Sequence, residues 1–172
     1  IILACVAYIK KHRKSPSSQN TKYEPYVSIL IPAYNEAVSI VAKMENTLSL
    51  DYPKEKLKIV WITDGSDDET LNILKQYDSI SVFHEPQRRG KIHAMNRGMK
   101  LINTPIVVFT DANTMLNRYA VRAIVKYFAD PLVGCVAGEK RIKLNDVEKA
   151  VEAGEGLYWQ YESLVKKLES DS

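Results

Sequence analysis

Short, mainly apolar runs alternate along most of the chain with stretches whose apolar residues recur every three or four positions. Continuous runs rich in Val and Ile are typical of strands buried on both faces, and the intervening period is that of amphipathic helices. The runs predict strands over residues 27–31, 57–62, 80–83, 106–109 and 133–137. This alternation favours an α/β fold with a mostly parallel sheet covered by helices.

The helix predicted after the first strand has an apolar stripe at helical spacing, formed by Val38, Val41, Met44 and Leu48. Asn35 lies just before it and suits the N-cap, because its side chain can accept a hydrogen bond from an amide of the first turn. The next helix is predicted to begin at about residue 67.

Polar residues follow three of the predicted strands where each strand ends. Tyr34-Asn35-Glu36, Asp64-Gly65-Ser66 and Asp111-Ala112-Asn113 occupy these positions. The carboxyl ends of parallel strands meet at one edge of a sheet, where open α/β folds bind their ligands. Asp111 and Asn113 offer hard oxygen atoms that suit Mg²⁺ or Mn²⁺. The alternative for this pair is a turn in which both side chains satisfy local amides.

A basic loop, residues 87–91, precedes another predicted helix. Lys91 and the helix N-terminus behind Gly90 would supply positive potential for a phosphate. With the acidic strand ends, this predicts a site for a metal–diphosphate nucleotide; the alternative is a solvated loop. A P-loop is excluded because Ile92 follows Lys91, and no Gly-x-Gly-x-x-Gly follows the first strand.

Charge is uneven along the 172 residues, whose formal net charge is +3. Residues 1–22 hold five basic residues and no acid, so the remainder carries −2. The body of the chain is therefore no basic platform for nucleic acid, and no nucleic-acid partner is expected. Cys5 and Cys135 are far apart in sequence and give neither a disulfide framework nor a zinc spacing, which favours a reducing compartment.

The ends of the chain differ from its centre. Residues 1–9 are almost wholly apolar and 10–14 are basic, but a spanning helix needs about 20 apolar residues. We interpret residues 1–14 as the end of a membrane helix with its cytoplasmic basic flank, the alternative being a buried terminal segment. Residues 15–26 are a polar linker. Residues 143–172 predict one amphipathic helix.

Four motifs between residues 27 and 113 resemble those of family-2 glycosyltransferases, in the same order. They correspond to the family's opening strand, its second nucleotide motif, its G-K-x-x-A-x-N-x-G helix and its D-x-D metal motif. The residues that carry the resemblance are Val27 to Glu36, Asp64-Gly65-Ser66 with Asp68, Gly90-Lys91 with Ala94, Asn96 and Gly98, and Asp111-Ala112-Asn113. The flanking membrane segment is similar to that of bacterial synthases of hyaluronan, cellulose and poly-N-acetylglucosamine.

The resemblance implies a GT-A fold and a hexosyltransferase that moves a sugar from a UDP-sugar donor to a growing glycan, with inversion and a divalent metal, Mn²⁺ or Mg²⁺. It also implies a cell-membrane enzyme whose catalytic domain is cytoplasmic. The roles implied for matched positions are Ala33, Tyr34 and Glu36 beside the uridine, Asp64 as acceptor from the uracil N–H, Lys91 at the diphosphate, Asp111 at the metal and sugar, and Asn113 near the metal. Asn113 replaces the family's usual second Asp, and a neutral amide is a weaker ligand.

The family's general base is an acidic residue in a later motif, followed in synthases by Q-x-x-R-W, and residues 143–172 contain no such pair. Glu139 could reach the site, although a surface acid beside Lys140 and Arg141 is the alternative. We therefore expect residues 27–142 to be the nucleotide-sugar-binding part of an incomplete catalytic domain. The missing acceptor half would follow residue 172, and the fragment alone would be inactive.

Two other classes of protein remain as hypotheses. A non-catalytic nucleotide-binding module could retain the GT-A fold. A nucleotidyltransferase that forms sugar nucleotides would need a Gly-rich, Arg-containing loop after the first strand, and residues 32–36 do not form one.

Overall fold

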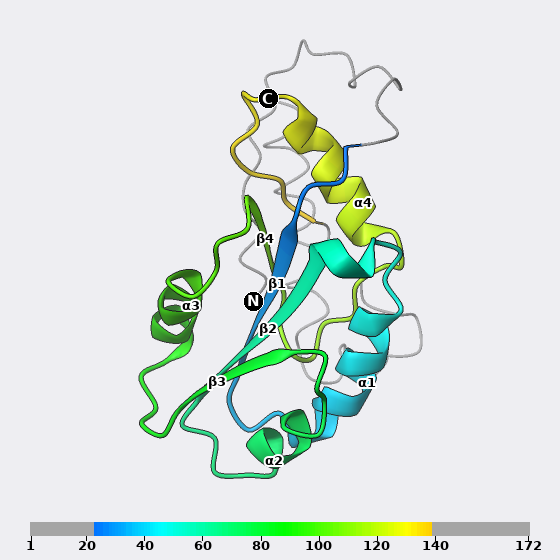
Figure 1. The fold of residues 1–172 in the computed structure, drawn as a ribbon. Helices are drawn as coiled ribbons and strands as arrows, with labels where there is room; N and C mark the ends of the chain where they lie inside the picture. The colour runs from blue at the N-terminus through cyan, green and yellow to red at the C-terminus, as the bar shows by residue number, and fades with distance from the viewer. Residues whose placement is uncertain (1–22, 139–172) are drawn as a thin grey trace, which may run out of the picture. The chain divides into compact units, whose positions relative to one another are not determined.

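A computed structural model describes residues 23–138 (Figure 1). The chain divides into two compact units: residues 23–129 belong to one and residues 130–138 to the other. The predicted membrane helix (1–14), most of the linker (15–22), Glu139 and the amphipathic helix (143–172) lie outside the described residues. Within residues 23–138, no helix is long and apolar enough to cross a membrane.

The first unit is built on a four-stranded parallel sheet with the order β3-β2-β1-β4. The strands are β1 (Val27–Ala33), β2 (Leu57–Asp64), β3 (Ser81–Glu85) and β4 (Ile106–Phe109). In the register of the sheet, Ala33 of β1 pairs with Thr63 of β2, and Leu30 of β1 pairs with Phe109 of β4. The chain therefore leaves β1, β2 and β4 at the same edge of the sheet. The predicted parallel sheet and four of its strands are confirmed.

Helices cover both faces of this sheet (Figure 1). They are α1 (Ala37–Leu48), α2 (Thr70–Leu74), α3 (Lys91–Met99) and α4 (Ala120–Val125), with 3-10 turns at Lys54–Lys56 and Lys126–Ala129. The larger apolar cluster joins one face to α1, α2 and α4, and it contains Trp61, which is fully buried. The indole N–H of Trp61 has no hydrogen-bond partner among the described residues.

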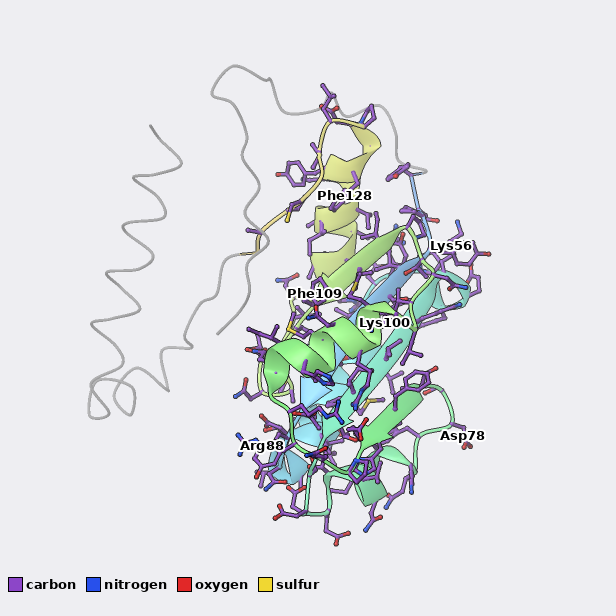
Figure 2. All side chains as sticks on the ribbon, turned by 90° about the vertical axis from the view of Figure 1, so that its left-hand side faces the viewer. Lys56, Asp78, Arg88, Lys100, Phe109 and Phe128 are labelled. Atoms are coloured by element: carbon purple, nitrogen blue, oxygen red, sulfur yellow. The ribbon has the colours of Figure 1, made fainter. Side chains whose placement is uncertain are left out.

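The opposite face of the sheet is covered by α3, which faces the viewer in Figure 2. Gly98 lets the helix approach closely, because a Cβ there would lie 2.6 Å from Cδ1 of Leu30 and 2.9 Å from Cγ1 of Ile62. The other end of the helix, its N-terminus, lies beside the carboxyl end of β2, because the Gly90 N–H donates to the Asp64 carboxylate.

The apolar stripe predicted for α1 does not match the face that the helix buries. Val38 is 98% exposed and Val41 is 50% exposed, whereas Met44 is buried together with Ile40, Lys43 and Thr47. These four positions also recur at helical spacing. Lys43 and Thr47 are tolerated there because each has a hydrogen-bond partner: Lys43 binds Thr110, and Thr47 donates to the Lys43 carbonyl.

Two further predictions are corrected by the structure. The helix expected from about Asp67 begins at Thr70, because Asp68 instead accepts a hydrogen bond from the Thr70 amide. Residues 133–137 do not form the predicted strand. An apolar run becomes a strand only where a neighbouring strand takes its backbone hydrogen bonds, and β1 to β4 pair only with one another among the described residues.

Candidate functional site

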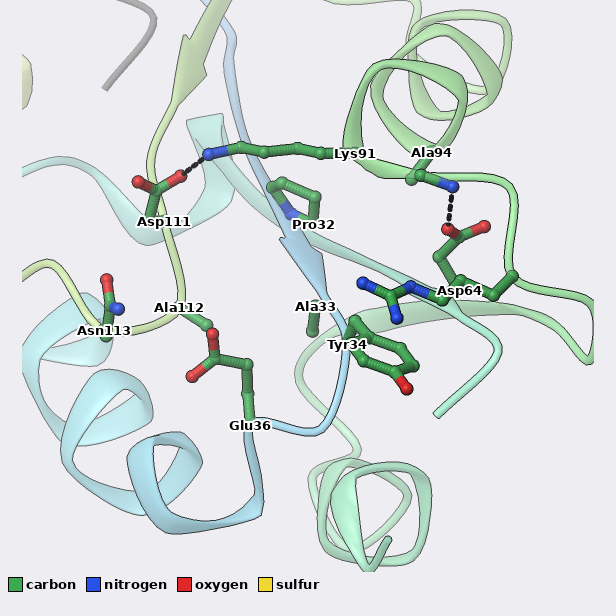
Figure 3. A pocket seen from close by; sticks show the side chains of 12 residues that line it. Pro32, Ala33, Tyr34, Glu36, Asp64, Lys91, Ala94, Asp111, Ala112 and Asn113 are labelled. Atoms are coloured by element: carbon green, nitrogen blue, oxygen red, sulfur yellow. Dashed lines mark hydrogen bonds and ion pairs between the residues drawn. The ribbon is translucent and has the colours of Figure 1, made fainter. Parts of the chain in front are cut away.

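A pocket lies at the carboxyl ends of β1, β2 and β4 and is closed on one side by α3 (Figure 3). All the site residues predicted from the sequence line it, namely Ala33, Tyr34, Glu36, Asp64, Lys91, Asp111 and Asn113. The structure therefore brings together residues up to 80 positions apart in the sequence. It adds Pro32, Arg88, Gly90, Ala94 and Ala112 to the lining.

The loop after β1 is tied to the loop after β2 through Asn35. Its φ is +51°, a left-handed conformation that asparagine tolerates better than most residues. The Asn35 amide group donates to Asp67 (2.6 Å) and accepts from the Asp67 backbone N–H (3.1 Å). The prediction that Asn35 is the N-cap of α1 is therefore wrong, because its side chain binds Asp67 in the other loop. This reciprocal pair holds Tyr34 and Glu36 at the pocket.

The start of α1 is capped by the first residue of α2 and by the loop before it. The Glu36 N–H donates to Thr70 Oγ1 (2.8 Å) and the Ala37 N–H donates to the Asp68 carboxylate (3.1 Å). Desolvation opposes ionisation of Asp68, but hydrogen bonds from Thr70 and Ala37 outweigh it and hold the pKa of Asp68 below its ordinary value. The Asp68 side chain thus remains an acceptor for the helix.

Asp64 is only 3% exposed and uses its two carboxylate oxygens differently. Oδ2 accepts hydrogen bonds from the backbone N–H groups of Arg89 (3.0 Å) and Gly90 (2.6 Å). Oδ1 is buried and has no hydrogen-bond partner among the described residues. A buried acceptor without a partner is costly, so this oxygen is suited to accept from a ligand N–H.

The geometry at Asp64 depends on a close backbone contact between two loops. Gly65 has φ +68°, and a Cβ there would lie 2.5 Å from the backbone nitrogen of Arg88. Its N–H donates to the carbonyl of Glu85 at 2.7 Å. Glycine at this position therefore allows the basic loop to lie against the end of β2, where its amides reach Asp64.

Arg88 lines the pocket but is absent from the site residues predicted from the sequence. Its guanidinium carbon lies 3.7 Å from the centroid of the Tyr34 ring, a cation–π contact at the edge of the pocket. The neighbouring Arg89 side chain instead donates to Gln87 at 3.3 Å and does not line the pocket. Of the two arginines in the basic loop, only Arg88 therefore lines the pocket, and the sequence alone did not distinguish them.

Lys91 and Asp111 form an ion pair across the pocket, with 2.5 Å between Nζ and Oδ1 (Figure 3). The turn around Asp111 is closed by its backbone, because the Thr114 N–H donates to the Asp111 carbonyl at 3.2 Å. The Asp111 carboxylate instead reaches the first residue of α3. A turn is therefore present, as in the alternative interpretation, but the carboxylate has a charged partner.

Lys43 is a buried residue behind this turn and is absent from the site residues predicted from the sequence. Its ammonium donates to Thr110 Oγ1 at 2.9 Å and to the carbonyl of Thr114. Burial lowers the pKa of Lys43 to about 8, although the Asp111 carboxylate acts in the opposite direction. The only signal in the sequence was that position 43 belongs to the helical stripe that includes Ile40 and Met44.

The described residues supply an incomplete ligand set for a metal. Among residues 23–138 there is no group of three or more His, Cys, Asp or Glu side chains that could hold an ion. Asp111 and Asn113 contribute one carboxylate and one amide at the pocket. These donors fit a hard cation such as Mg²⁺ or Mn²⁺ only if a ligand provides further oxygen atoms, as a diphosphate would.

Solved structures share this fold. A mannosyltransferase from Pyrobaculum calidifontis, in complex with GDP-Man and Mn²⁺, superposes with a TM-score of 0.61 at 34% identity, over 64% of this chain and 34% of that one. The structure of S. aureus TarS 1-349 in complex with UDP has a TM-score of 0.56 at 24% identity, over 61% of this chain and 32% of that one. The α/β architecture is therefore the GT-A fold predicted from the sequence.

Sequence comparisons agree with this assignment. "Probable glycosyltransferase YdaM" of Bacillus subtilis (strain 168) is 33% identical over 144 residues, which are 78% of this chain and 34% of that protein. Poly-beta-1,6-N-acetyl-D-glucosamine synthase of Staphylococcus aureus (strain COL) is 32% identical over 121 residues, 68% of this chain and 29% of that protein. The chain thus spans about a third of the length of these relatives. The family described as "Glycosyl transferase family 2" matches residues 28–167, and the chain belongs to this family.

Proposed function

We propose that this chain binds a UDP-sugar and presents it for inverting transfer to a growing glycan. The observation that carries the proposal is at Asp64, which lines the pocket and whose buried Oδ1 has no hydrogen-bond partner among the described residues. The N3–H of uracil is a hydrogen-bond donor and could supply the partner that this oxygen lacks. Acceptance by a carboxylate makes this a charge-assisted hydrogen bond.

The aromatic ring of Tyr34 supports the same placement of the base. It lines the pocket near Asp64, and one face is in contact with the Arg88 guanidinium. A flat, electron-poor base can stack either on this guanidinium or in its place on the ring. Glu36 and Ala33 also line the pocket, and the resemblance to the family implies the uridine beside them.

The other end of the pocket suits the diphosphate. Lys91 is the first residue of α3, so both its ammonium and the helix N-terminus favour an anion there. A bound diphosphate would compete with Asp111 for Lys91 and leave the Asp111 carboxylate to the metal. When bound by Asp111 and Asn113, a divalent ion would neutralise charge that develops on the departing diphosphate.

The general base is left unassigned among the described residues. Deprotonation of the acceptor hydroxyl requires a positioned acid–base residue, which contributes typically about 10²–10⁴-fold. The acids that line the pocket, Glu36, Asp64 and Asp111, all have proposed roles in donor binding. We therefore propose that the base and the acceptor site belong to a longer protein and that this chain alone does not make polymer.

A membrane location is part of the proposal and rests on the apolar and basic residues at positions 1–14. The S. aureus relative named as a poly-beta-1,6-N-acetyl-D-glucosamine synthase supports a polysaccharide acceptor. Radiolabelled UDP-sugar should give polymer with the full-length protein in membranes and none with this chain. Polymer from the chain alone at a comparable rate would contradict the missing-base proposal, and Glu139 would be the first residue to replace.

A second candidate donor carries guanine. The structure of the P. calidifontis mannosyltransferase contains GDP-Man. Guanine also has N–H groups, from which a carboxylate can accept hydrogen bonds. Calorimetric titration of the chain with UDP, GDP and CDP in the presence of Mn²⁺ distinguishes the bases, and we expect UDP to bind most tightly. Tighter binding of GDP would replace the uridine assignment, whereas no binding of any of them would favour a module that has lost donor recognition.

A further inference from the structure

The turn that carries Asp111 and Asn113 is held from behind by polar side chains of α1. Lys43 donates to Thr110 Oγ1 and to the Thr114 carbonyl, which lie immediately on either side of the predicted metal-binding residues. Nearly one helical turn further along, Asn46 donates to the Leu116 carbonyl (2.8 Å) and accepts from the Leu116 N–H (2.8 Å). Helix α1 therefore holds the 110–116 segment at three positions, namely Thr110, Thr114 and Leu116.

Lys43 is an unusual choice for this position. Its side chain has no exposed surface, and it does not line the pocket. A buried ammonium is costly unless it is hydrogen-bonded or paired, and an apolar residue would suit the surrounding core of Ile40 and Met44 better on packing grounds alone. Its position is explained by what it binds, since both of its acceptors belong to the turn.

The turn needs such support, because a metal ligand acts well only if its side chain is already oriented. Asp111 is half-buried and Asn113 is exposed at the rim of the pocket. The Thr114 N–H closes the turn on the Asp111 carbonyl, and the Thr114 carbonyl is in turn the acceptor for Lys43. Loss of Lys43 would thus free the turn at both of its ends, while the Asp64 end of the pocket would keep all its contacts.

We propose that Lys43 is a positioning residue for donor binding: it holds the 110–114 turn so that Asp111 and Asn113 bind the metal together with the donor diphosphate. This inference rests on the proposed function and adds to it a residue outside the pocket. It assigns Lys43 no contact with donor or metal. Its effect is therefore on the part of donor affinity that depends on the metal.

The test uses the full chain with Lys43→Met, which keeps side-chain length but removes both hydrogen bonds and the charge. UDP affinity is measured by calorimetry with Mn²⁺ and with EDTA. We expect Lys43→Met to reduce the gain in affinity from Mn²⁺ by about tenfold or more, as is usual when a residue that orients metal ligands is lost. Affinity in EDTA should stay within about twofold of the parent.

Thr47→Val is the matched control. Thr47 is equally buried on α1, but its hydroxyl donates to the Lys43 carbonyl within the helix and not to the turn. It should therefore lower stability without changing the gain from Mn²⁺. If Lys43→Met does not fold, Thr110→Val removes one of the two acceptors while keeping the side-chain volume, and a smaller loss of the same gain is expected.

A second measurement separates this inference from the proposed function. Hydrogen exchange in the ligand-free chain should be faster at the Thr114 amide in Lys43→Met than in the parent, and unchanged there in Thr47→Val. A parent that gains no affinity from Mn²⁺ would refute the metal role, while exchange would still decide whether Lys43 holds the turn. Unchanged exchange at Thr114, or an equal loss of UDP affinity with Mn²⁺ and with EDTA, would overturn the inference.

Discussion

Replacement of Asp64 by Asn is the sharpest test of how the base is recognised. The change keeps the shape of the side chain, and the remaining oxygen can still accept from the Arg89 and Gly90 amides. That leaves an NH₂ group in the place of the buried Oδ1. If Asp64 accepts a hydrogen bond from uracil N3–H in the parent, as proposed, Asp64→Asn would present a donor there instead.

The expected magnitude follows from the hydrogen bond that is lost. A hydrogen bond to a charged group contributes about 1.5–3 kcal/mol, which corresponds to a loss of about 10- to 150-fold in UDP affinity. Cytosine has an acceptor at N3 where uracil has a donor. CDP should therefore be affected much less, and the preference of the parent for UDP over CDP should narrow or reverse in Asp64→Asn.

Calorimetric titration of the parent and of Asp64→Asn with UDP and CDP measures this change in preference directly. Asp78→Asn removes a carboxylate at an exposed position before β3 that does not line the pocket, and it controls for the change in net charge (Figure 2). Thermal unfolding checks that the variants are folded. If Asp64→Asn binds UDP as tightly as the parent, or loses UDP and CDP equally, Asp64 does not read the base.

Three further outcomes are expected. UDP should bind more tightly with Mn²⁺ than with EDTA, and Asp111→Ala should remove that difference in calorimetry; a metal-independent affinity would return Asp111 to a purely structural role in the turn. Gly65→Ala should lower the free energy of unfolding by denaturant by about 1–3 kcal/mol, because the position combines positive φ with a backbone contact of 2.5 Å. Gly90→Ala, with φ +94° and nothing within 4 Å, should lower it less, and equal losses in the two variants would contradict the role of the contact. Burial lowers the pKa of Lys43 from 10.5 to about 8, so between these values the unfolded chain binds more protons and the free energy of unfolding should rise with pH; Lys43→Met should lack this rise, and a parallel pH profile in both proteins would refute it.

The sheet could be predicted from the sequence because its signals are local. The apolar runs of β1, β2 and β4 each end at a polar cluster, and parallel topology then brings those clusters to one edge. The run at 133–137 has the same local pattern but forms no strand, since strand formation also depends on a pairing partner elsewhere in the fold.

The parts that escaped prediction depend on contacts distant in sequence. Two stripes at helical spacing run along α1, and the buried one includes Lys43, whose acceptors on Thr110 and Thr114 lie more than 60 residues away. The role of Asn35 was likewise decided by Asp67 and not by the adjacent helix. A buried lysine and a loop-bridging asparagine carry no signature of their own in the sequence.

The buried indole of Trp61 has a practical consequence for these measurements. The chain has two tryptophans, and among the described residues only Trp61, on β2, lies in the core, within the larger apolar cluster. An indole that is shielded from water and makes no hydrogen bond emits at shorter wavelength than one in solvent. In a Trp159→Phe background, fluorescence would therefore report the integrity of the sheet alone. Since Trp61 does not line the pocket, the same optical signal would separate variants that weaken donor binding from variants that loosen the fold.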